Sequence, residues 1–287
     1  MEQVSFWESF TLWRDPMIVA IVSAAMLAYL GVFIVLKRVV FVSAALSAMS
    51  GVGVAVSFFL ASLLQIPPHA APAWLDPHLY ALGSAALGAS FFSYNLGHRR
   101  ISGESAIGLG YIIASALVIL VLQSPRVAQE AHEINDLLYG NTVAVSTHML
   151  WVTTATFGGV VVVHATFRKE LLFVAFDPEV ARTLGYGTRR WSLGLFGTFA
   201  IAVSVTTQAI GALPVFAFMV IPPAAALLLA SRLWSVFAAA VGIAVFSAAI
   251  GYYLSFIWSL PTGATMVVVA AAWMVPGLVR LALGRIR

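Results

Sequence analysis

His132 and Asp136 are the side chains whose types and spacing most directly suggest chemistry, because imidazole and carboxylate groups both bind divalent cations. They lie four residues apart in a stretch with helical apolar spacing, so both would project from one face of a surface helix and could share one ion. A surface helix whose polar face is only exposed to solvent, and binds nothing, would carry the same residues. The pair therefore has two readings. It could belong to a weak external capture site for a cation or to an acidic rim where a binding protein docks, or it could simply be part of a solvated surface.

A few other polar side chains fall inside or at the edge of long apolar runs. Hydroxyl groups keep one face of the run 41–64 mildly polar, a carboxylate begins the run 104–123, and an amide belongs to the most polar patch of the run 191–210. Such groups can line a transport pathway. They can equally serve close packing of helices, and the carboxylate also suits the positive end of a helix dipole. The pathway candidates are Ser43, Ser47, Ser50, Glu104 and Gln208.

Several motifs that would indicate catalysis are missing from the sequence. There is no Walker loop for ATP, no H-E-x-x-H or G-x-S-x-G motif, and no pair of carboxylates within an apolar run. The chain has no cysteine, which excludes disulfides, thiolate metal sites and cysteine nucleophiles. Its basic residues do not gather in one stripe, so the basic pI does not indicate nucleic-acid binding. We expect a chain that is not an enzyme and binds no cofactor of its own.

The composition requires a membrane. Hydrophobic residues make up 61% of the 287 positions and charged residues only 9%, with a mean hydropathy of +0.98. A soluble domain has roughly 25% charged residues. The sequence therefore predicts one all-α transmembrane bundle over residues 1–287, in which Pro214 together with Pro222-Pro223 would break the seventh helix. About nine spans are expected: 17–36, 41–64, 78–97, 104–123, 147–167, 191–210, 213–230, 234–257 and 262–283.

The distribution of positive charge predicts the orientation of these spans. If the first connection faces the cytoplasm, all but Arg14 and Arg126 of the 15 basic residues are cytoplasmic. The N-terminus is then outside, the C-terminus inside, and segments 1–16, 65–77 and 124–146 are external. The first apolar run has no small-residue cleavage site, so it is read as a retained span rather than a signal peptide.

The cytoplasmic segment 168–190 is unusually polar for this chain. Asp177 and Pro178 are typical of a helix start, Glu179 suits the first turn, and Gly185 suits the end, with Arg182 between. A capped helix between two spans suits docking to a soluble partner, whereas a mere connection could be much shorter. The alternative is a solvated loop that only marks the cytoplasmic side.

Six stretches in register resemble the permeases of ABC importers for zinc, manganese or iron. They include FDPEVARTLGYGTRR (176–190), QAIGALPVFAFMVIPPAAALLLASRL (208–233) and SLPTGATMVVVAA (259–271). The resemblance implies a bacterial plasma-membrane subunit that works by alternating access. It implies that 177–185 is the coupling helix for a cytoplasmic ATPase, which holds the ATP. A second permease copy or paralogue and an extracytoplasmic substrate-binding protein would complete the transporter.

The second span departs from the family pattern. Members carry an aspartate and a histidine where this chain has Ala44 and Ala48, and alanine cannot bind a cation. A metal would then pass without those ligands, or a non-identical partner permease would supply them, or the substrate would not be a metal. A channel or secondary transporter that does not use ATP is the alternative from another class.

Overall fold

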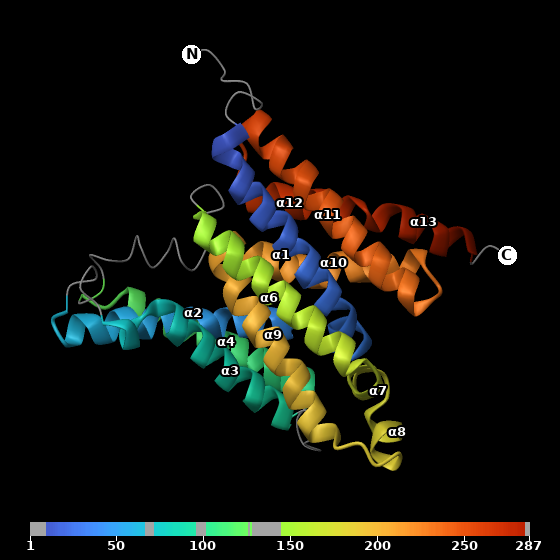
Figure 1. The fold of residues 1–287 in the computed structure, drawn as a ribbon, viewed down its shortest axis with the longest axis horizontal. Coiled ribbons are helices and arrows are strands. Elements are labelled where there is room, and N and C mark those ends of the chain that lie inside the picture. The colour runs from blue at the N-terminus through green and yellow to red at the C-terminus, as the bar shows by residue number, and fades with distance from the viewer. Residues whose placement is uncertain (1–9, 67–71, 96–101, 126, 128–144, 285–287) are drawn as a thin grey trace.

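The computed structural model describes residues 10–66, 72–95, 102–125, 127 and 145–284, and all regular structure in these ranges is helical (Figure 1). The candidate cation pair His132 and Asp136 lies outside the described residues. The helices are α1 (Phe10–Leu36), α2 (Val42–Leu63), the 3₁₀ turn η2 (Ala73–Leu75), α3 (Pro77–Asn95), α4 (Gly103–Leu122), α6 (Thr147–Thr166), α7 (Arg168–Phe176), α8 (Pro178–Thr183), α9 (Thr188–Ile210), α10 (Ala212–Leu229), α11 (Leu233–Trp258), α12 (Thr262–Ala272) and α13 (Met274–Gly284).

Eight spans in the described part of the chain are long and apolar enough to cross a membrane, one fewer than the number predicted. The helix that falls short is α3, whose polar ends and many small residues lower its hydropathy. It nevertheless packs along α2 and α9. The last span is divided into α12 and α13 at Trp273, because Pro276 has no N–H to donate to the carbonyl of Ala272.

Helix α1 forms the centre of the bundle. The apolar window of α1 is 72% buried, whereas the corresponding windows of α4 and α6 are 11% and 17% buried. Figure 1 shows α2, α3 and α4 grouped on one side and α11 to α13 on the other, with α1, α6, α9 and α10 between them. The peripheral helices therefore present apolar faces that suit lipid or another membrane subunit.

Small residues bring the helix axes close together in two places. A β-carbon at Gly53 of α2 would overlap with the carbonyl oxygen of Tyr80 in α3, so only glycine fits there. Gly31 of α1 lies in the same way against the carbonyl of Met219 in α10. These contacts fix how closely α3 packs on α2 and how closely α10 packs on α1.

The prediction that prolines break the seventh helix was wrong. Helix α10 runs without interruption through Pro222 and Pro223. Pro223 leaves the carbonyl of Met219 without its helical donor, and the close approach of Gly31 covers that position. Packing against α1 thus keeps the helix continuous where local preference disfavours it.

Candidate docking segment and transport pathway

The start of α8 has the capped geometry that the sequence predicted. Asp177 Oδ1 accepts hydrogen bonds from the backbone N–H groups of Glu179 at 3.1 Å and Val180 at 3.0 Å. Pro178 occupies the first turn, where its missing N–H has no helical acceptor to lose. Two of the free donors at the start of α8 are therefore satisfied by one carboxylate.

The end of α8 turns sharply at a glycine. Gly185 has φ +83°, a left-handed conformation that glycine adopts without steric cost, and the N–H of Tyr186 reaches back to the carbonyl of Ala181 at 3.0 Å. The ring of Tyr186 then stacks on Phe173 of α7, with centroids 5.9 Å apart. The two short helices are thus folded against each other as one unit.

Helix α7 was not foreseen from the sequence, which placed only one helix in this segment. Its signal was present in Leu171, Val174 and Ala175, which are spaced for one helical face and are buried in the structure. Charged residues at its start concealed the pattern. Two ring contacts hold the beginning of α7: Phe167 lies 5.1 Å from Trp191 of α9, and Arg168 lies 3.9 Å over the ring of Trp234 in α11.

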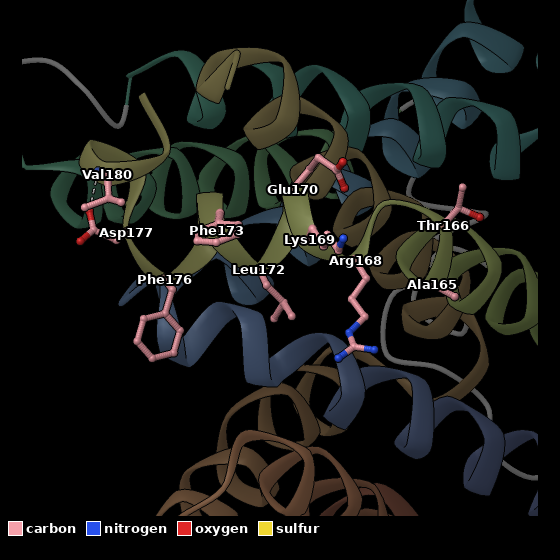
Figure 2. A pocket seen from close by; sticks show the side chains of 10 residues that line it. All are labelled: Ala165, Thr166, Arg168, Lys169, Glu170, Leu172, Phe173, Phe176, Asp177 and Val180. Carbon is pink, nitrogen blue, oxygen red and sulfur yellow. Dashed lines mark hydrogen bonds between the residues drawn. The ribbon is translucent and has the colours of Figure 1, made fainter. Parts of the chain in front are cut away.

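A cavity of about 820 Å³ opens beside α7 and α8 (Figure 2). Apolar and charged groups share its lining, and Figure 2 shows Arg168, Leu172 and Phe176 projecting to the same side of the segment. The Phe176 and Leu184 side chains are 65% and 60% exposed. Glu179 and Arg182 are also exposed. Exposed apolar residues among charges on a segment outside the spans are typical of a protein-docking surface.

The serines proposed for the pathway lie between α2 and α9. Ser47 shares a hydrogen bond of 3.0 Å with Thr207, and Ser50 Oγ donates to Ser204 Oγ at 3.3 Å. Ser43 Oγ donates to the carbonyl of Val40 at 3.4 Å. All three serines are buried. In this conformation the hydroxyl groups of Ser47 and Ser50 join α2 to α9, whereas that of Ser43 bonds only to the backbone just before α2.

The other two pathway candidates bond to groups far away in the sequence. Gln208 of α9 pairs through its side-chain oxygen with Nδ1 of His78, at the start of α3. Glu104, in the first turn of α4, accepts a hydrogen bond from the backbone N–H of Phe41 at 3.3 Å. The five candidates therefore do not form one cluster: the serines and Gln208 lie along α2 and α9, and Glu104 lies at the N-terminus of α2.

Ala44 and Ala48 occupy a half-exposed face of α2, away from the buried serines. In the described part of the chain, no group of three or more histidine, aspartate or glutamate residues lies close enough together to hold a metal ion. His164 is instead held within the bundle, where Nε2 is 3.0 Å from Thr198 Oγ1. Because that hydroxyl donates to the carbonyl of Leu195 at 2.7 Å, His164 is the donor in the first contact.

The fold defines a multi-pass membrane protein in which two short helices, α7 and α8, connect two of the spans. The chain matches the ABC 3 transport family over residues 9–280 and belongs to it. It is therefore the membrane-embedded permease component of an ABC transporter, not a catalytic subunit, and it is a multi-pass protein of the bacterial inner membrane.

Individual relatives agree with this assignment. The manganese transport system membrane protein MntC of Listeria innocua is 32% identical over 187 residues, which cover 65% of each chain. The manganese import system permease protein ScaB of Streptococcus pneumoniae is 24% identical over 92% of this chain and 88% of its own. The structure described as PsaBC from Streptococcus pneumoniae in complex with Fab has the same fold, with a TM-score of 0.79 at 23% identity over 95% of this chain and 94% of that one.

Proposed function

We propose that this chain is the permease of an ABC importer for a divalent metal ion, zinc or manganese. Family membership carries the proposal, and the names of the Listeria and Streptococcus relatives favour manganese as the first substrate to test. A separate ATPase would hold ATP on the cytoplasmic side. A substrate-binding protein would deliver the ion from outside, and the two permease subunits would move it by alternating access.

The α7–α8 segment is the proposed ATPase contact. It supports this role because its shape is fixed by the Asp177 cap and the Tyr186–Phe173 stack. A rigid surface loses little conformational entropy on binding. The exposed side chains of Phe176 and Leu184 would supply apolar contact, and Glu179 and Arg182 would supply charged groups at its rim.

The proposed ion pathway has to work without carboxylate or imidazole ligands at Ala44 and Ala48. A non-identical second permease could supply these ligands, or the ion could cross with few protein ligands. We favour the first arrangement, because hydroxyl groups such as those of Ser47 and Ser50 bind transition metals weakly. In this conformation the hydroxyl groups of these two serines are also hydrogen-bonded to residues of α9.

Uptake by a deletion strain tests the substrate. Cells that lack the gene should accumulate less manganese or zinc than the parent, and a plasmid copy should restore the difference. Iron uptake, measured in the same cells, serves as the comparison. Equal accumulation of all three metals in deleted and parental cells would refute a metal importer and favour another substrate. Uptake that persists without the ATPase gene would favour the channel or secondary transporter.

A further inference from the structure

Lys37 joins three parts of the chain on the side of the bundle where α7 lies. Its Nζ donates to the carbonyl of Val174 in α7 at 3.2 Å and to Ser192 Oγ in α9 at 3.3 Å. Lys37 itself follows the last residue of α1 and stands five positions before Val42, the first residue of α2. Figure 1 shows the end of α1 beside α7.

The carbonyl of Val174 is available because of the residue that begins the next helix. In a continuous helix its donor would be the N–H of residue 178, but that residue is Pro178, which has none. The Lys37 ammonium supplies the missing donor. A cation also suits the negative end of the α7 dipole. The proline that permits the corner between α7 and α8 therefore creates the acceptor that Lys37 binds.

The backbone around Lys37 is shaped to make this contact. Arg38 adopts a left-handed conformation with φ 57°, unusual for a residue other than glycine, and the N–H of Val39 returns to the carbonyl of Ile34 at 3.2 Å. This tight reversal ends α1 and leads directly into α2. A strained residue held in place by its surroundings is a signal of a functional constraint.

The charge of Lys37 is not accounted for by an ion pair. Among the described residues the recorded ion pair is Arg14–Asp15, so no described carboxylate lies within 4.0 Å of Lys37. Burial lowers the pKa of Lys37 to about 8. A half-buried ammonium that donates to a backbone carbonyl and a hydroxyl, with no compensating carboxylate, is costly. It points to a role other than stability alone.

We propose that Lys37 is the positioning residue that transmits displacement of the α7–α8 segment to α2. The inference rests on the proposed function, in which that segment contacts an ATPase. Lys37 connects α7 and α9 to the α1–α2 turn, and α2 is bonded in turn to α9 through Ser47–Thr207 and Ser50–Ser204. A shift of the corner at Val174 thus moves the start of α2 relative to α9.

Single-cysteine labelling tests this role without any assumption about the substrate. The chain has no cysteine, so Ala48→Cys places one thiol on the half-exposed face of α2. The protein is purified with its ATPase, and the labelling rate by a maleimide is compared without nucleotide and with a non-hydrolysable ATP analogue. We expect the analogue to change the rate severalfold. In Lys37→Met the analogue should leave the labelling rate nearly unchanged while the ATPase remains bound.

Three further variants distinguish a loss of the nucleotide response at α2 from a general loss of folding. Lys37→Arg keeps a cationic donor and should retain most of the nucleotide response. Ser192→Ala removes one of the two acceptors of Lys37 and should lose part of the nucleotide response. The double variant Ser192→Ala with Lys37→Met should lose no more of the response than Lys37→Met alone. Arg232→Met removes a positive charge from the start of α11, outside the bonded set, and should respond like the parent.

The outcomes are distinguishable. If the parent protein does not retain its ATPase, the proposed function fails. If the ATPase is retained and Lys37→Met responds to nucleotide as the parent does, the Lys37 role is refuted. Additive losses for Lys37→Met and Ser192→Ala would also refute it, because two partners in one bond cannot act independently. If Lys37→Met does not fold, the Ser192→Ala and Lys37→Arg responses decide the question.

Discussion

The carboxylate of Glu104 accepts the backbone N–H of Phe41 at 3.3 Å, so a side chain from the first turn of α4 caps the first turn of α2. Phe41 is the N-cap residue of α2, and its own side chain makes no capping bond. Ser102 caps α4 independently by accepting the N–H of Ser105 at 3.1 Å. Glu104 therefore stabilises two helix starts at once, through its bond to α2 and its position in the dipole of α4.

This relationship predicts different effects for two substitutions of Glu104. Glu104→Ala should lower the free energy of unfolding by about 1 kcal/mol, as expected for loss of a helix cap. Glu104→Gln keeps an oxygen acceptor and should be close to the parent. Thermal unfolding of the purified protein in detergent measures both. A gating role would give the opposite pattern, in which Glu104→Gln impairs uptake without a change in unfolding temperature.

Charge reversal on α8 should weaken the contact with the ATPase and thereby lower uptake. We expect Glu179→Arg with Arg182→Glu to weaken retention of the ATPase, because both side chains are exposed on the proposed contact. Gly185→Val should add to the loss, since a β-branched residue is strained at φ +83°. Pull-down of the ATPase and uptake in membranes measure these effects.

The control for these variants is their abundance in the membrane, which should match that of the parent because the changes lie outside the spans. Asp177→Asn keeps the side-chain oxygen that caps α8 and should retain ATPase binding, whereas Asp177→Ala should lose part of it. Full ATPase retention and uptake in the triple variant would show that the contact lies elsewhere.

Restoring the family ligands at Ala44 and Ala48 should create a tighter cation site. The two positions lie four residues apart on the half-exposed face of α2, so aspartate and histidine there can converge on one ion. We expect Ala44→Asp with Ala48→His to increase retention of manganese and to lower its turnover, because a tightly bound ion leaves slowly. Equilibrium binding of the metal and initial uptake rates measure the two effects.

The absence of ligands at Ala44 and Ala48 also leads to a test of whether the transporter contains two copies of this chain or two different permeases. If a paralogous subunit carries the ligands, the parent chain alone with the ATPase should show no manganese-stimulated hydrolysis. Manganese-stimulated hydrolysis by a reconstituted homodimer of the unmodified chain would contradict that arrangement.

The orientation of the chain remains a prediction, with the N-terminus outside. Because the protein has no cysteine, Ser124→Cys and Ser102→Cys provide single thiols at the two ends of α4. An impermeant thiol reagent added to intact cells should label the first and not the second. Lysed cells provide the control, in which both should react. The reverse pattern in intact cells would overturn the assignment.

Much of the fold follows from composition and local chemistry. A chain with 61% hydrophobic residues has to satisfy its backbone within helices in a bilayer, so the class and most spans are readable without coordinates. Asp177 and Pro178 act on groups within a few residues of themselves, which is why the start of α8 could be predicted correctly. Hydropathy alone does not identify α3 as a span, because its small residues pack closely and contribute little apolar surface.

Only the tertiary structure decided which distant groups meet. The pairs Ser47–Thr207, Glu104–Phe41 and Lys37–Val174 join positions separated by 160, 63 and 137 residues. No local periodicity encodes such pairs, since they depend on how the helices cross and how closely glycines such as Gly31 allow them to approach. The sequence by itself therefore determined the fold class, most of the spans and the local cap of α8. Packing in three dimensions determined which hydroxyls, carbonyls and charges bond between them, because those bonds form only after the helices have docked.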